Sequence, residues 1–115
     1  MFEEKARRVG FKVYRKEVVY EALTGESVRE ERLVGYNEEI NAKVSYSKME
    51  GEESGRLYIT VSGSRATGSM AEKAQNLGGK VDLEEGKRLF AVFKGVSPDE
   101  AGELVEKMFR GSRRP

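Results

Sequence analysis

The sequence predicts an α+β fold, in which two strand–strand–helix units form a four-stranded antiparallel sheet and additional helices precede them. The main observation is an internal repeat: segments 56–63 (RLYITVSG) and 88–95 (RLFAVFKG) share Arg, Leu, an aromatic residue and a closing Gly. A repeated pattern of elements is a sound guide to architecture. We therefore expect one domain over residues 1–115, divided into 1–39 (N-terminal helical segment), 40–79 (first unit), 80–111 (second unit) and 112–115 (basic tail).

The N-terminal segment shows apolar residues at helical spacing. Phe2, Ala6 and Val9 predict a short helix that ends near Gly10, and residues 11–14 predict a short strand. This strand leads into the part of the chain with the weakest local signals.

Residues 16–34 allow two interpretations. An apolar stripe over 16–23, stopped by Thr24 and Gly25, predicts a helix. A second helix over 28–34 would begin at a capping box formed by Ser27 and Glu30. The alternative is a β-hairpin centred on Thr24 and Gly25, because Val and Tyr favour strands. The helical interpretation is the one used in the fold class above.

Each repeated unit shows two strands followed by a helix. Residues 40–49 and 56–62 predict the first hairpin, and residues 80–83 and 88–94 predict the second. A helix over 70–77 would have Ser69 as its N-cap, and the last helix would follow the capping sequence Ser-Pro-Asp-Glu that begins at Ser97 and end at Gly111. Alternate strand residues should face these helices. The residues expected to be nearly fully buried are Leu57, Ile59, Leu89, Phe93, Leu104, Val105 and Met108.

The composition excludes several classes of chemistry. The chain contains neither Cys nor His. It therefore has no thiol nucleophile, no thiolate metal site and no imidazole general base. Pairs of Glu residues lie in polar turns or on helix faces, where solvated charge explains them. We predict a protein that is not an enzyme and that holds no cofactor or metal.

Charge and hydropathy indicate where the protein works. Charged residues make up 36% of the chain, and Glu far exceeds Asp, a composition typical of hyperthermophile proteins. No apolar run approaches membrane-spanning length, and the start of the chain lacks the regions of a signal peptide. These observations predict a cytoplasmic protein with no membrane partner.

The candidate site is the sheet face opposite the helices. Aromatic rings interleaved with Arg and Lys suit single-stranded nucleic acid, because bases stack on rings and cations neutralise phosphates. The residues predicted on this face are Arg56, Tyr58, Arg88, Phe90 and Lys94, with Tyr46 or Lys43 added according to the register of the first strand.

Two questions about this face stay open from the sequence. Residues 1–40 must pack somewhere, and covering the face would make Tyr58 and Phe90 ordinary core residues. Partial coverage would instead leave an apolar cleft. A separate candidate is the loop 63–69, where Arg65 and free backbone N–H groups precede a helix and could hold a phosphate.

The two Arg-aromatic strands, 56–61 and 88–93, together with the cysteine-free and charge-rich composition, resemble the archaeal ThermoDBP group. Members of this group are single-stranded DNA-binding proteins of hyperthermophiles and their relatives. The resemblance implies that Tyr58 and Phe90 grip bases in an apolar cleft lined by Arg56 and Arg88. No zipper-like tail follows Met108, so the resemblance does not decide whether copies of the chain form a homo-oligomer.

We therefore predict a binder of single-stranded nucleic acid, DNA before RNA, with little sequence preference. The alternative is a protein-interaction or assembly module that uses the same sheet face. Salt separates the two hypotheses, since phosphate binding weakens steeply as salt rises and an apolar protein interface hardly responds.

Overall fold

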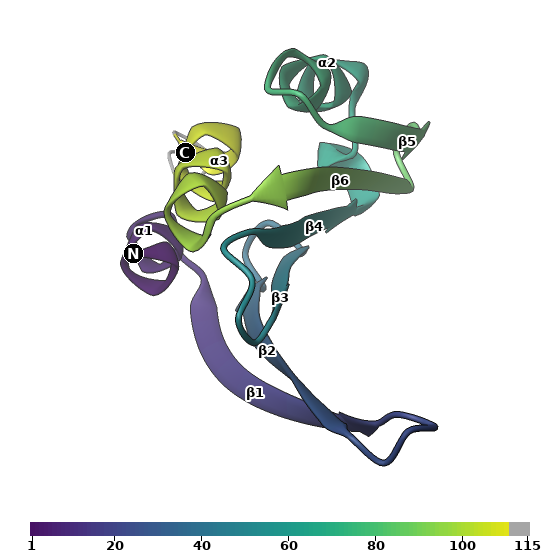
Figure 1. The fold of residues 1–115 in the computed structure, drawn as a ribbon. Coiled ribbons are helices and arrows are strands. Elements are labelled where there is room, and N and C mark those ends of the chain that lie inside the picture. The colour runs from purple at the N-terminus through teal and green to yellow at the C-terminus, as the bar shows by residue number, and fades with distance from the viewer. Residues whose placement is uncertain (111–115) are drawn as a thin grey trace.

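The computed structural model describes residues 1–110 and contains one six-stranded antiparallel sheet with the strand order β1-β2-β3-β4-β6-β5. Three α-helices lie on one face of this sheet (Figure 1). A 3₁₀ turn, η1, joins β4 to α2. The elements are α1 (Phe2–Arg8), β1 (Lys12–Glu21), β2 (Ser27–Asn37), β3 (Ala42–Met49), β4 (Gly55–Ser62), η1 (Gly63–Arg65), α2 (Gly68–Asn76), β5 (Lys80–Glu84), β6 (Arg88–Val96) and α3 (Pro98–Phe109).

The predicted α+β class is correct, but the predicted four-stranded sheet is wrong. The four expected strands form β3, β4, β6 and β5, and two further strands extend the sheet beyond β3. The two segments predicted as helices, 16–23 and 28–34, form a hairpin instead. Residues 16–21 lie in β1, residues 22 and 23 lie in the turn with Gly25 at φ +86°, and residues 28–34 lie in β2. The N-terminal segment therefore holds one helix and a hairpin.

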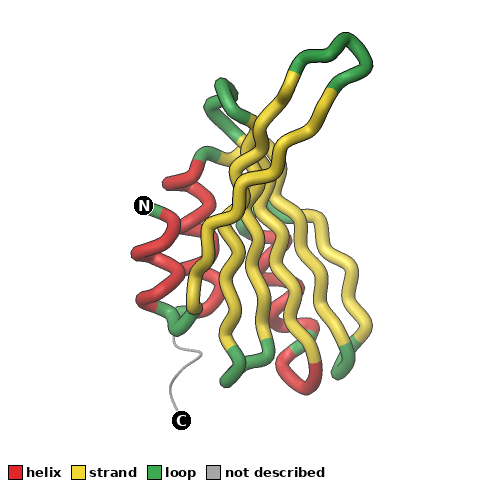
Figure 2. The backbone as a smooth tube through the Cα atoms, turned by 90° about the horizontal axis from the view of Figure 1, so that it is seen from below, coloured by secondary structure: helices red, strands yellow, loops and turns green. Residues whose placement is uncertain are grey.

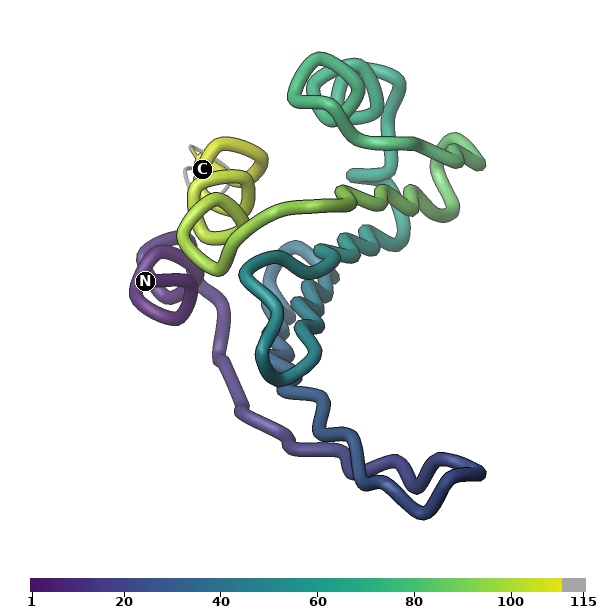
Figure 3. Tube along the Cα trace, viewed as in Figure 1, coloured from purple at the N-terminus to yellow at the C-terminus, as the bar shows by residue number. Residues whose placement is uncertain are grey.

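The hairpin forms because β2 pairs along its whole length with β1 and, from Glu30 to Asn37, also with β3. The backbone N–H and C=O groups of these residues therefore form hydrogen bonds to neighbouring strands, whereas in a helix they would bond to residues of the same segment. The capping box predicted at Ser27 does not form, since Glu30 lies inside β2. The hairpin turn reaches well beyond the other strands (Figures 2 and 3), along the 50 Å long axis of the molecule.

The predicted repeat has a clear structural counterpart. Ile59 and Ala91 occupy the same position in the two repeated segments, and they pair directly between β4 and β6. A local two-fold relation therefore passes through this pair. The two units place their helices, α2 and α3, on the same face of the sheet (Figure 1).

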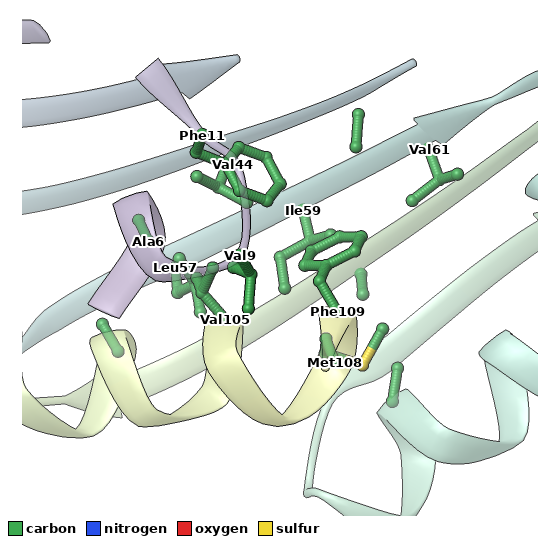
Figure 4. Packing of buried hydrophobic residues seen from close by; sticks show 14 of the residues in the cluster. Ala6, Val9, Phe11, Val44, Leu57, Ile59, Val61, Val105, Met108 and Phe109 are labelled. Atoms are coloured by element: carbon green, nitrogen blue, oxygen red, sulfur yellow. The ribbon is translucent and has the colours of Figure 1, made fainter. Parts of the chain in front are cut away.

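The core lies between the sheet and the helices, where Figure 4 shows apolar side chains from β3, β4 and the helices in contact. Six of the seven residues predicted as buried are buried, whereas Leu104 is only half-buried on α3. Phe109 takes the deeper position and packs edge-on against Phe11 with ring centroids 5.0 Å apart. The buried stripe of α3 is therefore rotated about the helix axis, away from Leu104 and toward Gly102 and Phe109.

Helix caps agree with the sequence at α3 and differ at α2. The Ser97 hydroxyl accepts a hydrogen bond from the backbone N–H of Glu100, whose carboxylate accepts one from the N–H of Ser97, so the capping box is confirmed. At α2 the N-cap is Thr67, which accepts from Met70 N–H at 3.2 Å, and the predicted cap Ser69 lies inside the helix. The predicted helix stop at Gly111 and the basic tail lie outside the described residues.

Candidate nucleic-acid interface

The face of the sheet opposite the helices is open in the part of the chain that is described. Figure 2 shows the strands in front and the helices behind them, with no element laid over the strands. The N-terminal hairpin extends the sheet sideways instead of covering it, because β2 pairs with β3 and β1 pairs with the outer side of β2. Tyr58 and Phe90 are therefore surface residues of a sheet and not part of a second core.

Strand pleating and register place the predicted residues of β4 and β6 on this face. Side chains alternate between the two faces, and directly paired residues share a face. Leu57 and Ile59 are buried against the helices, so their neighbours point the other way. The residues brought onto the open face are Arg56, Tyr58, Thr60 and Ser62 of β4, and Arg88, Phe90, Val92 and Lys94 of β6.

Tyr58 and Phe90 form the centre of the open face. They are equivalent in the repeat, and each lies one position from the Ile59–Ala91 pair, on either side of the local two-fold. Their ring centroids are 6.2 Å apart and their planes differ by 24°, so the rings are stacked. Both side chains are half-buried by their neighbours. One broad aromatic surface results.

Cations surround this aromatic pair. Arg56 lies opposite Lys94 at one end of the β4–β6 ladder, and Arg88 lies opposite Ser62 at the other end. Lys43 of β3 lies opposite Thr60 of β4. All four cations are exposed. Within residues 1–110, Arg56, Arg88 and Lys94 form no ion pair with a carboxylate. Their charge is thus available to a ligand.

Two hollows run along the open face and share Glu30, Ser47 and Tyr58 in their walls. The larger, of about 680 Å³, lies between the β1–β2 hairpin and the ends of β4 and β6. The smaller, of about 390 Å³, continues past Tyr58 to Phe90. Together they form a groove along the aromatic pair.

A polar cluster that the sequence did not predict lies beside this groove. The nearly buried carboxylate of Glu30 accepts hydrogen bonds from Arg32 Nε at 3.0 Å, from Arg32 Nη2 at 3.1 Å and from Tyr20 Oη at 2.5 Å, and the Ser47 hydroxyl also donates to it. These bonds, above all those from Arg32, lower the pKa of Glu30 to about 2 although burial opposes the shift. The cluster joins β1, β2 and β3.

The cluster decides the role of Arg32. Its guanidinium lies on the open face but is paired with Glu30 through two hydrogen bonds. A charge neutralised in this way is a weaker phosphate ligand than Arg56 or Arg88. We therefore infer that Arg32 and Glu30 stabilise the position of the β1–β2 hairpin beside the groove.

Two predicted site residues do not lie on the open face. Tyr46 is buried on the helix side, where it stacks on Phe2 at 5.9 Å and its hydroxyl donates to the Val96 carbonyl at 2.8 Å. Burial raises its pKa. The register of β3 thus selects Lys43, one of the two alternatives, and excludes Tyr46. Arg65 is exposed in η1, at the connection from β4 to α2, and so lies off the sheet.

Three aromatic residues of the open face were not predicted from the sequence. Tyr14 and Tyr20 alternate with Lys12, Lys16 and Val18 along β1, and Tyr36 lies opposite Lys12 on β2. The signal that could have found them is this alternation, which has the period of a strand. The helical interpretation of residues 16–34 hid it.

Metal-binding clusters and membrane-spanning helices are both absent from the described residues. Among residues 1–110, no group of three or more His, Cys, Asp or Glu residues could hold a metal ion. None of the helices in that range is long and apolar enough to cross a membrane.

No family model, curated protein or solved structure matches this chain. The resemblance to the ThermoDBP group therefore stays a prediction. What the residues of the open face can do must be argued from their own chemistry.

Proposed function

We propose that the open face of the sheet binds single-stranded nucleic acid, DNA before RNA, with little sequence preference. The observation that carries this proposal is the stacked pair of Tyr58 and Phe90 with Arg56 and Arg88 at its two ends. Rings accept the faces of any unpaired base. Within the described residues the two arginines form no ion pair, although Glu84 of β5 lies opposite Arg88.

The geometry favours single strands over duplexes. Stacking on Tyr58 or Phe90 needs a base whose face is free, and in a duplex both faces are covered by neighbouring base pairs. Among the strand residues of the open face, basic residues outnumber acidic ones, and Glu30 is already paired with Arg32. The basic residues are Lys12, Lys16, Arg32, Lys43, Arg56, Lys80, Arg88 and Lys94; the acidic ones are Glu30, Asp82 and Glu84.

The test is a fluorescence-anisotropy titration with labelled oligo-dT and with its duplex, each at low and moderate salt. We expect tighter binding of the single strand and a steep loss of affinity as salt rises. Arg88→Ala should lower the slope of log K against log salt by about 0.7, the value for one phosphate contact on a single strand. Lys107→Ala is the matched control, because Lys107 is an exposed cation on α3, behind the sheet.

The protein-interaction hypothesis gives a different result in the same titration. An apolar protein interface has no reason to prefer oligo-dT over duplex or to respond steeply to salt. Equal affinity for both ligands, or a slope that Arg88→Ala and Lys107→Ala change equally, would reject the proposed function.

A further inference from the structure

We propose that Tyr14 and Tyr36 form a second base-stacking platform, so that a bound single strand crosses the strands of the sheet from β6 to β1. This inference rests on the proposed function and adds a second subsite to it. Neither residue was among the residues expected from the sequence, and neither touches the Tyr58–Phe90 pair in the ring contacts of the described chain.

The two tyrosines are exposed aromatic residues that need an explanation. Tyr14 is 59% exposed and Tyr36 is 44% exposed, so neither contributes much to the core. Their ring centroids lie 6.4 Å apart with planes tilted by 57°. Lys43 Nζ lies 5.6 Å from the centre of the Tyr36 ring, within cation–π range. An aromatic pair with a cation beside it repeats the chemistry of the central site.

The registers place this second pair level with the first. One row across the sheet reads Tyr36 on β2, Lys43 on β3, Thr60 on β4 and Phe90 on β6. The next row reads Tyr14 on β1, Val34 on β2, Ser45 on β3 and Tyr58 on β4. Each row therefore begins with a ring of one pair and ends with a ring of the other.

The separation of the pairs suits a short single strand. Ring-bearing positions in each row are three strand spacings apart, or about 14 Å at roughly 4.8 Å per spacing. That distance corresponds to about four stacked nucleotide steps of roughly 3.4 Å, and to fewer steps if the strand is extended. A ligand that fills both platforms would therefore have about four to six nucleotides, at the short end of the range for sheet-based binders.

The surface between the pairs leaves room for a backbone. The hollow of about 390 Å³ there is lined by the small hydroxyl residues Ser45, Ser47 and Thr60, with Lys43 at its side. Lys43 thus lies between the platforms, where a phosphate linking two stacked bases would pass. Beyond Tyr36, the hollow of about 490 Å³ is bounded by Glu38 and Glu39, whose charges oppose an extension of the strand in that direction.

The experiment compares oligo-dT of increasing length, from about two to about ten nucleotides, on the wild type and on the double variant Tyr14→Ala/Tyr36→Ala. For the wild type, affinity should rise with length and level off at about six nucleotides. The double variant should bind the longer oligomers at least roughly tenfold more weakly, since each lost stack is worth about 1–3 kcal/mol and 1.4 kcal/mol is tenfold. Oligomers of about three nucleotides should bind both proteins alike, because the central pair suffices for them.

Three further variants separate stacking from other causes. Tyr36→Phe should keep wild-type affinity, because the ring remains. Val19→Ala should also keep it, since Val19 is an exposed residue of the same hairpin that points to the opposite face. Phe90→Ala, in the central pair, should weaken short and long oligomers alike. Melting curves of the Tyr14, Tyr36 and Val19 variants should stay close to that of the wild type, because these side chains are exposed.

The outcomes distinguish this inference from the proposed function. If the double variant binds long oligomers as tightly as the wild type while Phe90→Ala weakens them, the second platform is wrong and the proposed function stands. If the double variant weakens short and long oligomers equally, the two pairs are one site and the crossing path is wrong. If the wild type binds no oligo-dT, both proposals fall together.

Discussion

The two faces of the sheet handle charge in opposite ways. Behind the sheet, cations of α1 meet acids of α3, with Lys5 Nζ 3.5 Å from Glu103 and Arg8 Nη1 3.7 Å from Glu106. On the open face, Arg56 and Arg88 have no such partner among residues 1–110. Exposed ion pairs add little stability, so the pairing behind the sheet mainly removes charge that could attract ligands. The contrast agrees with the proposal that the open face is the one that binds a ligand.

Two adjacent residues of β4, Leu57 and Tyr58, show how the two faces differ in burial. Leu57 has no exposed surface and lies among helix side chains, as Figure 4 shows. Tyr58, one residue on, points to the open face and stacks on Phe90. Substitution of each by Ala should therefore affect different properties of the protein.

The largest effect is expected from Leu57→Ala. It removes a fully buried side chain and leaves a cavity between β4 and α3, which should cost about 2–5 kcal/mol of unfolding free energy. Chemical denaturation followed by circular dichroism measures this loss. A cost below about 1 kcal/mol would mean that the helix side of the sheet is not the core.

Tyr58→Ala should instead lower affinity for oligo-dT by about 1–3 kcal/mol, because one stacking ring is lost. The loss of stability should be smaller than that of Leu57→Ala, since Tyr58 is only half-buried. Anisotropy titrations beside melting curves measure the two properties. A variant that unfolds like Leu57→Ala, or that binds like the wild type, would remove the distinction between the faces.

The Glu30 cluster gives a pH-dependent comparison. The pKa of Glu30 is about 2 in the folded protein against an ordinary value of 4.5, so its stabilising effect is fully present above about pH 4.5 and is lost as pH falls toward 2. Glu30→Gln keeps the shape but removes the charge, and should cost about 1–2 kcal/mol near neutral pH. Its unfolding free energy should then fall less steeply between pH 4.5 and 2 than that of the wild type. If the unfolding free energies of the two proteins fell equally steeply between pH 4.5 and 2, this role of Glu30 would be contradicted.

The smallest effect is expected from Ser97→Ala, which removes the N-cap hydroxyl of α3 and should cost about 1 kcal/mol. Affinity for oligo-dT should not change, because the cap lies behind the sheet. Ser97→Thr, which keeps a hydroxyl, is the control. Equal melting temperatures for Ser97→Ala and the wild type would show that the cap does not limit the stability of α3.

The part of the fold that could be predicted is the part in which local and long-range signals agree. The segments around Leu57 and Leu89 alternate with the period of a strand, and polar turns and helix caps such as Ser97 bound them. Each signal is complete within a few residues, so the sequence alone indicates the element. The open-face positions of Tyr58 and Phe90 follow directly from that alternation.

The part that could not be predicted depends on a distant partner. Val18 and Val19 fit a helical stripe as well as a strand, and the choice is made by the ladders that join β1 to β2 and β2 to β3. The same dependence hid Glu30, whose partners Tyr20 and Ser47 come from different strands. The choice between Tyr46 and Lys43 depends on a distant partner in the same way, since only the register of β3 decides which of them lies on the open face.

The close contact of the first and last helices has a consequence for how the chain folds. A Cβ on Gly102 of α3 would lie 2.9 Å from Phe2 Cα, so α1 packs directly on the backbone of a residue one hundred positions later in the sequence. Contacts between residues so far apart in sequence slow folding, because a long loop must close first. Phe2 also stacks on Tyr46 of β3, but α1 makes most of its contacts with α3. The packing of α1 is therefore complete only when α3 has formed.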